Sequence, residues 1–298
     1  MSTETLPTAA PRRRLAVGPR RSPILTIAAL AMVAYFLLPL WWLVMASTKS
    51  NADLFSSFGL WLAPNFSLLD NLRDVFTAQD GIYLLWIRNT FLYAIVSGLG
   101  AAILATMTGY AIAKLRFRGR GGLFGIIMGA IMIPLTALAI PTYLLFAQMG
   151  LTNTPWAVIL PSLVSPFGVY LMRVYAADAV PDSLIEAARV DGAGEWRIFS
   201  TIALRLLAPG FVTVLLFALV STWNNYFLPL IMLNSTEWYP LTVGLAQWQS
   251  TAQGGSGSQA LFSMVITGSL VSILPLMVAF LFLQRYWQSG LATGGVKQ

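Results

Sequence analysis

Residues 121–172 read GGLFGIIMGAIMIPLTALAIPTYLLFAQMGLTNTPWAVILPSLVSPFGVYLM, a run of 52 residues without a charged side chain. A membrane-spanning helix needs about 20 consecutive apolar residues, so this run is long enough for two. The segment Gly150-Leu151-Thr152-Asn153-Thr154-Pro155 is polar and rich in residues that end helices, and it divides the run. The sequence therefore predicts two spanning helices, at about 123–148 and 156–173.

Four other stretches also lack charge, and they extend the same pattern over most of the chain. They cover 24–48, 89–113, 206–236 and 238–284. The last one begins with Tyr239-Pro240 and a run rich in Gln, Gly and Ser, which shortens its expected helix. We expect an all-α integral membrane protein with six transmembrane helices, at about 24–48, 89–113, 123–148, 156–173, 206–233 and 261–283.

The composition supports this fold class and excludes several functions. Hydrophobic residues make up 57% of the 298 residues and charged residues only 10%, whereas soluble domains carry roughly 25% charged residues. The chain has no Cys and no His, which removes thiolate chemistry, the commonest metal ligand and the usual general base. It also lacks a G-x-x-x-x-G-K-[ST] phosphate loop. We expect no catalytic residue, no metal, no cofactor and no nucleic-acid partner.

The basic residues predict the orientation of the chain in the membrane. Fifteen of the eighteen Lys and Arg residues lie in the two tails and in the second and fourth connections, and only Lys49, Arg73 and Arg88 lie elsewhere. Because basic residues concentrate on the cytoplasmic side, both termini are expected to be cytoplasmic. The tails are residues 1–23, expected to be disordered, and 285–298, and residues 49–88 form an extracytoplasmic loop.

The first apolar stretch could instead be a secretory signal, because Arg residues precede it. Its 25 uncharged residues exceed the apolar region of a signal peptide, and no clear A-x-A cleavage site follows. We interpret it as a retained helix.

One polar connection carries an ordered pattern of residues. Residues 181–193 read PDSLIEAARVDGA. Ser183 followed by Glu186 fits a capping box that begins a short helix, and Gly192 suits a left-handed helix end. A second amphipathic piece follows, with Trp196, Ile198, Phe199 and Ile202 as its apolar positions. The helix could lie on lipid headgroups, or it could dock into the groove of a partner protein.

At these residues the sequence resembles a known family. Glu186-Ala187-Ala188, Gly192, Ile202 and Leu204 are similar to the EAA loop, E-A-A-x3-G-x9-I-x-L-P, of permease subunits in binding-protein-dependent ABC importers. Arg205 stands where the family has Pro. The resemblance extends over roughly residues 71–297, and three further stretches are similar to the sugar-importer branch and its MalG-like members: 150–154, 223–230 and 284–297.

The resemblance implies an ABC importer permease fold with a core domain over 89–284 and a coupling loop over 181–204. It implies a non-catalytic subunit of the bacterial inner membrane that forms half of a sugar pore. The implied partners are a second homologous permease, a pair of ATPase subunits, an extracytoplasmic sugar-binding protein and membrane lipid. The implied ATPase-coupling residues are Leu184, Glu186, Ala187, Ala188, Asp191 and Gly192, with Leu184, Ala187 and Ala188 as the docking surface. Polyols or glycerol phosphate are alternative substrates, and a membrane enzyme or scaffold is an alternative class.

Two other segments are candidates for contact with substrate or partner. Trp223, Asn224, Asn225 and Tyr226 place aromatic and amide groups, which suit a sugar, within one turn of an expected helix. The same residue types also form interhelical hydrogen bonds and settle at membrane interfaces. The outer loop at about 234–260, which carries Glu237, Trp238, Tyr239, Trp248 and the run Gly254–Ser258, is expected either to meet the binding protein or to be a slack connector.

Overall fold

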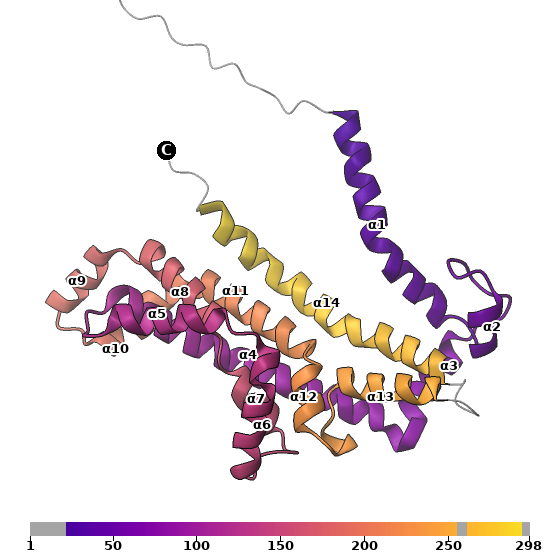
Figure 1. The fold of residues 1–298 in the computed structure, drawn as a ribbon. Coiled ribbons are helices and arrows are strands. Elements are labelled where there is room, and N and C mark those ends of the chain that lie inside the picture. The colour runs from indigo at the N-terminus through magenta and orange to yellow at the C-terminus, as the bar shows by residue number, and fades with distance from the viewer. Residues whose placement is uncertain (1–21, 255–260, 294–298) are drawn as a thin grey trace, which may run out of the picture.

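The computed structural model describes residues 22–254 and 261–293, and in these ranges it contains helices and no strand. Five helical segments are long and apolar enough to cross a membrane, and a sixth forms if a sharply bent pair counts as one span. This confirms the expected all-α membrane fold. Figure 1 shows the chain as an elongated bundle from which the amino-terminal helix diverges.

Most connections between the helices are short, and the segment 57–67 between α2 and α3 is a longer irregular one. Their bounds are α1 Pro23–Ser47, α2 Asn51–Ser56, α3 Leu68–Thr77, α4 Ile82–Lys114, α5 Arg120–Ile131, α6 Ala139–Gln148, α7 Trp156–Ser162, α8 Pro166–Ala179, α9 Asp182–Val190, α10 Glu195–Arg197, α11 Leu204–Trp223, α12 Phe227–Met232, α13 Leu241–Gln253 and α14 Leu261–Thr293. Short 3-10 segments occur at Ala78–Gly81, Leu135–Leu138 and Thr236–Trp238, and a π-helical segment at Ile198–Ala203 joins α10 to α11.

Two of the expected continuous helices are broken. The one expected at 123–148 consists of α5 and the segment Leu135–Gln148, which meet at an angle of 97°. The break lies at Pro134, which has no backbone N–H to continue the helix and disfavours helical geometry in the residue before it. The one expected at 156–173 is α7 and α8, interrupted before Pro166 and continued to Ala179. Proline therefore accounts for both corrections.

The expected helix at 206–233 also differs from the structure. A helical segment runs without interruption from Glu195 through Arg205 to Trp223, and α12 is a separate short helix. Arg205 in place of the family's proline is compatible with this continuity. The four residues from Trp223 to Tyr226 therefore do not form one helical turn, as the sequence suggested, but lie at a helix end.

The two long connections that are expected on the extracytoplasmic side are more ordered than the sequence predicts. The 49–88 connection contains α2, α3 and the first turns of α4, so Arg88 lies within α4 rather than before it. The 234–260 connection contains α13, whose Trp248 is buried. At the carboxyl end, α14 continues past residue 284 to Thr293, so most of the expected tail prolongs a helix.

Helix α4 is the centre of the packing, with α8 and α11 against it. A Cβ atom at Gly109 of α4 would lie 2.6 Å from Cβ of Met172 and 2.7 Å from the backbone nitrogen of Arg173, so the two helices touch at backbone distance. Buried side chains gather in one cluster around Tyr110 and Phe199 and in another around Trp86 and Trp248. The two clusters lie at opposite ends of α4.

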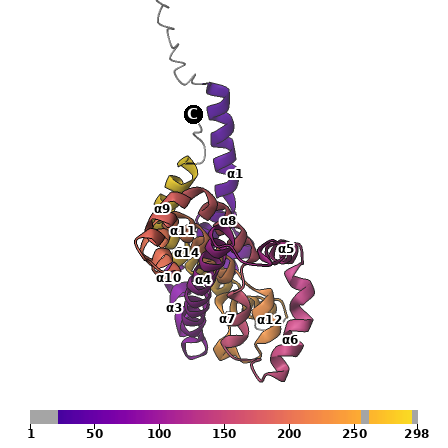
Figure 2. The same cartoon turned by 90° about the vertical axis from the view of Figure 1, so that its left-hand side faces the viewer.

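Helix α1 has almost no packing partner within the chain. Its 25 residues are apolar all round, and only Met45, Ala46 and Ser47 at its end are buried. Figures 1 and 2 show it standing apart from the bundle along most of its length. A helix this apolar and this exposed belongs in a lipid environment.

The close approach of α4 and α8 yields a test. We expect Gly109→Ala to lower the thermal midpoint of the detergent-solubilised protein, because the new methyl group would displace backbone atoms, at a cost of about 1–3 kcal/mol. Gly129→Ala in α5 is the matched control, since a Cβ atom there meets nothing within 4 Å. Fluorescence-detected size-exclusion after heating provides the measurement. Equal midpoints for the two variants would contradict the close packing.

Candidate functional site

Helix α9 begins two residues earlier than the capping-box pattern predicts. Pro181 occupies the N-cap position with extended backbone angles, and no side chain caps the helix. Ser183 is already the second helical residue, so its hydroxyl does not occupy the capping position that the sequence suggested. Pro181 ends the preceding connection because its fixed φ and missing N–H suit a helix start.

The end of α9 follows the prediction. Gly192 has φ of +81°, its N–H donates to the Arg189 carbonyl oxygen at 3.0 Å, and the Ala193 N–H donates to the Ala188 carbonyl oxygen at 2.9 Å. These two bonds define a Schellman motif, and Ala193 packs on the cluster that contains Ala188. The chain therefore turns back sharply toward α10.

One of the three residues predicted to form the docking surface of α9 is not on the outside of the helix. Ile185 and Ala188 are buried against Val180 and Phe199 of the same chain. Ala188 therefore serves the internal core and is not available for docking. The outward surface of the loop is lined by Leu184, Glu186, Ala187, Val190 and Asp191, all exposed.

Two exposed apolar side chains enlarge this outward surface. The residue exposure is 89% for Val190 and 67% for Trp196, whose ring lies 5.7 Å from that of Phe199. The sequence predicts Trp196 on an apolar face, and the expected docking surface does not include Val190. The spacing of Leu184, Ala187 and Val190 at three-residue intervals was the signal for a common helix face.

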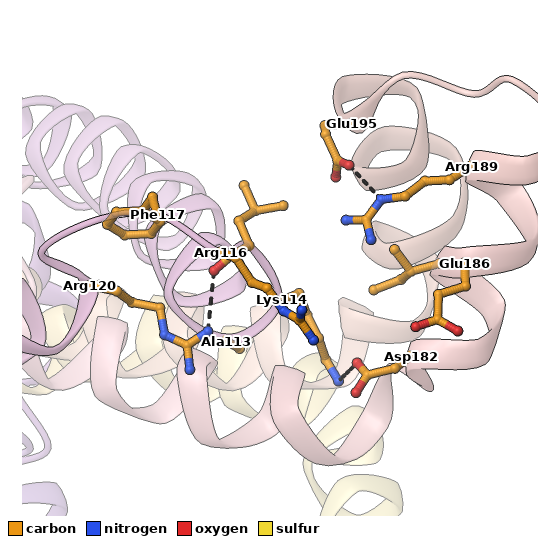
Figure 3. Close-up of a pocket in the computed structure, with 11 residues that line it drawn as sticks. Ala113, Lys114, Arg116, Phe117, Arg120, Asp182, Glu186, Arg189 and Glu195 are labelled. Carbon is orange, nitrogen blue, oxygen red and sulfur yellow. Dashed lines mark hydrogen bonds and ion pairs between the residues drawn. The ribbon is translucent and has the colours of Figure 1, made fainter.

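Ion pairs connect α9 to its neighbours, and Figure 3 shows them around a cavity of about 780 Å³. Lys114 at the end of α4 lies 2.7 Å from Asp182 at the start of α9, and Arg189 lies 2.7 Å from Glu195 of α10. Within the residues described, Glu186 has no ion-pair partner. Both ends of α9 are therefore fixed by charge, while the carboxylate between them remains available.

These pairs favour the charged forms of Asp182 and Arg189. The hydrogen bond from Lys114 and its charge lower the pKa of the Asp182 carboxyl below its usual range, and the hydrogen bond to Glu195 raises the pKa of Arg189. Asp182 therefore stays ionised, and its pair is lost only when the pH falls through that lowered pKa. In the described part of the chain, no group of three or more acidic residues could hold a metal ion. The exposed surface of α9 combines apolar and acidic side chains.

The structure separates the four candidates for the substrate path. Trp223 is buried, and its Nε1 donates to the Ser272 carbonyl oxygen of α14 at 3.2 Å, so it stabilises helix packing. Asn225 is bound to the backbone N–H of Leu228 and to the hydroxyl of Thr242. Asn224 and Tyr226 are exposed. Of the four, these two are exposed, Asn225 is half-buried and Trp223 is buried.

Asn224 continues an exposed stripe along α11. Phe217, Ser221 and Asn224 follow at intervals of four and three residues and are all exposed. Phe217 also lies in ring contact with Phe167 of α8 at 6.0 Å. Polar side chains on a spanning helix face a protein partner or a water-filled cavity rather than lipid.

The outer segment 233–240 is held firmly rather than slackly. Side chains of α4 donate to its carbonyl oxygens: Trp86 to Thr236, Asn89 to Glu237 and Tyr239, and Tyr93 to Trp238, at 2.7–3.1 Å. Asn153 accepts from the backbone N–H groups of Asn234 and Ser235. The alternative of a slack connector is wrong for this segment. Most of the glycine-rich run Gly254–Ser258 lies outside the described residues.

Comparisons with known proteins agree with this arrangement. The family model of binding-protein-dependent transport system inner membrane components matches residues 101–291. The arabinooligosaccharides transport system permease protein AraQ of Halalkalibacterium halodurans is 35% identical over 94% of this chain and 98% of its own length. AraQ of Bacillus subtilis is 31% identical over 93% and 99%, and the lactose transport system permease protein LacG of Rhizobium radiobacter is 29% identical over 93% and 98%.

Solved structures show the same fold. A chain of a bacterial ABC transporter involved in the import of the acidic polysaccharide alginate is similar with a TM-score of 0.78, over 91% of this chain and 100% of that one. Its sequence identity is 24%, so this likeness concerns the fold alone.

The Schellman motif allows a test of the α9 end. We expect Gly192→Ala to destabilise the last turn by about 1 kcal/mol, because alanine is strained at positive φ. Amide hydrogen exchange in residues 187–193 should then be about fivefold faster. Gly194→Ala is the control: Gly194 has φ of −73°, and a Cβ atom at either glycine would meet nothing within 4 Å. Unchanged exchange in Gly192→Ala would contradict a helix end that depends on left-handed geometry.

Proposed function

Because the chain belongs to the family of binding-protein-dependent transport system inner membrane components, we propose that it is the permease subunit of an ATP-driven importer for a carbohydrate. It is a multi-pass membrane protein and a non-catalytic transport component. In this proposal, the chain forms half of a translocation pore. The observation that supports the proposal is the outward surface of α9, where exposed apolar side chains lie beside exposed carboxylates.

The carbohydrate class is supported by the similar proteins. Arabinooligosaccharides and lactose are the substrates named for the relatives that cover nearly the whole chain. The exposed stripe of α11 provides an aromatic ring, a hydroxyl and an amide, and carries no charge. Such groups suit the apolar faces and hydroxyl rim of a neutral sugar better than a phosphorylated compound, which favours basic residues.

The proposed partners follow from what the chain lacks and what its family name states. The sequence has no phosphate loop, so a pair of ATPase subunits supplies hydrolysis. A second homologous permease completes the pore by covering the exposed faces of the bundle. An extracytoplasmic binding protein delivers the sugar to the outer segment 233–240, which α4 and Asn153 hold in a fixed conformation.

The coupling contact is assigned to the outward surface of α9 and its continuation. Leu184, Ala187 and Val190 provide its apolar part, and Trp196 adds an exposed ring. Glu186 and Asp191 provide charges for recognition. Ala188 and Gly192 act differently, since Ala188 anchors α9 to the core and Gly192 ends the helix. An interfacial helix on lipid headgroups is less compatible with this surface, because its acidic side chains would face anionic headgroups.

Movement of α9 would reach the bundle through two routes. The buried residues Ile185 and Ala188 connect it to α8 and the α10–α11 segment. The pair between Asp182 and Lys114 connects it to α4, and the same Nζ donates to the Ala177 carbonyl oxygen of α8 at 3.3 Å. One lysine therefore joins α4, α8 and α9.

The coupling contact can be tested by reversing a charge. We expect Glu186→Lys to leave the helices inserted, because Glu186 is exposed outside the spans, and to reduce both ATPase recovery and sugar uptake strongly. Gly192→Asp should act in the same direction through the helix end. The measurement is the amount of ATPase that co-purifies with each solubilised variant at matched expression.

Asp74→Lys provides the control, since Asp74 is an exposed acid on α3, which lies at the opposite end of the molecule from α9 (Figure 1). It should retain the ATPase. Full recovery with full uptake in Glu186→Lys would remove the coupling role from α9 and favour an interfacial helix.

The substrate path can be tested at Asn224. We expect Asn224→Ala to raise the apparent KM for uptake several-fold without changing assembly, because the side chain contributes polar contacts on an exposed stripe. Asp74→Asn is the control, since Asp74 is exposed on α3 and lies outside both the α11 stripe and the segment 233–240. Transport kinetics in proteoliposomes provide the measurement. Identical kinetics for both variants would exclude Asn224 from the path.

A further inference from the structure

The segment between α2 and α3 folds back along α1 toward the membrane. Trp41 Nε1 donates to the Leu60 carbonyl oxygen at 3.0 Å, and a Cβ atom at Gly59 would lie 3.2 Å from Nε1 of Trp42. Residues 59 and 60 therefore lie level with residues 41 and 42, six residues before the end of α1 at Ser47. Figure 1 shows this loop turning back beside the last turns of α1.

The depth of this contact follows from helix geometry. At 1.5 Å per residue, Trp41 lies about 9 Å from the end of α1, and the whole helix is about 37 Å long. A hydrocarbon core of about 30 Å leaves roughly 4 Å of the helix beyond each boundary. The fold-back segment therefore reaches about 5 Å inside the hydrocarbon boundary when α1 is centred in the bilayer.

The side chains of this segment suit that depth. Residues 54–69 read LFSSFGLWLAPNFSLL and contain no charge, although they lie in an extramembrane connection. Six large apolar side chains in this range are exposed by between 50% and 76%: Phe55, Phe58, Trp61, Leu62, Phe66 and Leu69. Aromatic residues are enriched where a protein meets the headgroup region.

Carbonyl and hydroxyl groups of the segment form hydrogen bonds with side chains of the same chain, which suits an environment with little water. Lys49 is buried, with 1% of its surface exposed, and its Nζ donates to the Phe58 carbonyl oxygen at 2.6 Å and to Ser57 Oγ at 2.8 Å. The Leu60 carbonyl oxygen accepts a hydrogen bond from Trp41 Nε1. Irregular backbone at membrane depth requires such internal partners.

We propose that residues 55–66 form an interfacial anchor that inserts into the outer leaflet beside α1, with the acyl chains and headgroup boundary of the lipid as its partner. The apolar patch continues the lipid-facing surface of α1, and Phe55 extends it to Phe262 at the start of α14, with ring centroids 5.5 Å apart. The anchor fixes the depth of α1, which has few contacts of its own. This inference depends on the membrane location of α1 and not on the transported substrate.

The absence of Cys from the sequence makes a direct test possible. Single-cysteine variants Phe58→Cys, Trp61→Cys and Leu62→Cys are labelled with an environment-sensitive nitrobenzoxadiazole dye and reconstituted into phosphatidylethanolamine–phosphatidylglycerol vesicles. We expect blue-shifted emission that lipids spin-labelled near the headgroup quench several-fold more strongly than aqueous iodide does. Asp74→Cys, exposed on α3, is the control and should show the reverse order.

Three results would overturn the proposal. Iodide quenching as strong as at residue 74 would place the segment in water. Iodide quenching that disappears when the purified binding protein is added would identify a protein-docking surface instead. Labels that neither quencher reaches would indicate coverage by another permease.

The link to α1 has its own measurement. In the Trp61→Cys background, Trp41→Phe removes the donor to Leu60 and should decrease lipid quenching and increase iodide quenching. Tyr35→Phe, at an exposed position of α1, should change neither. If Trp41→Phe also changes neither, the depth of the segment does not depend on its register with α1, and the proposed anchoring is wrong.

Discussion

The structure depends on one constraint: where a helix is interrupted near the bilayer, its backbone groups need partners from within the protein. At the interruption before α8, the Gly168 N–H donates to the side chain of Ser165, with 3.1 Å between nitrogen and Oγ. The interruption after α11 is covered by Asn225, which accepts from the Leu228 N–H through its side chain and from Thr242 through its carbonyl oxygen. Small polar side chains at the breaks therefore have a structural role before any functional one.

The same constraint explains the composition of the outer half of α4. Trp86, Asn89 and Tyr93 are buried, and each donates to a carbonyl oxygen of the segment that follows α12. These donors give the carbonyl oxygens of residues 236–239 partners within the protein, and a polar group that is buried without a partner costs about 1–3 kcal/mol. The outer segment is thus kept in one conformation by side chains that lie almost 150 positions earlier in the sequence.

The sequence predicts those features that depend on local chemistry or on the lipid environment. Long uncharged stretches predict the spanning helices because lipid tolerates few charges, and Gly192 predicts its own positive φ because the helix ends there. The breaks at Pro134 and Pro166 were missed, since proline is compatible with a kinked helix as well as with a broken one. Ala188 was assigned to the outer surface because its burial depends on Val180 and Phe199, which contact it only in the folded chain. Lys114 and Asp182 are 68 positions apart, and no local pattern connects them.

Helix α4 contacts α9 near one end and the 233–240 segment near the other. It is continuous over 33 residues, which is about 50 Å of helix, and contains no proline. At one end Lys114 is paired with the first residue of α9, and at the other end Trp86, Asn89 and Tyr93 hold the outer segment. Backbone-distance packing against α8 at Gly109 leaves little room for the helix to bend between these ends. The surface proposed for the ATPase and the surface proposed for the binding protein therefore lie at opposite ends of one continuous helix.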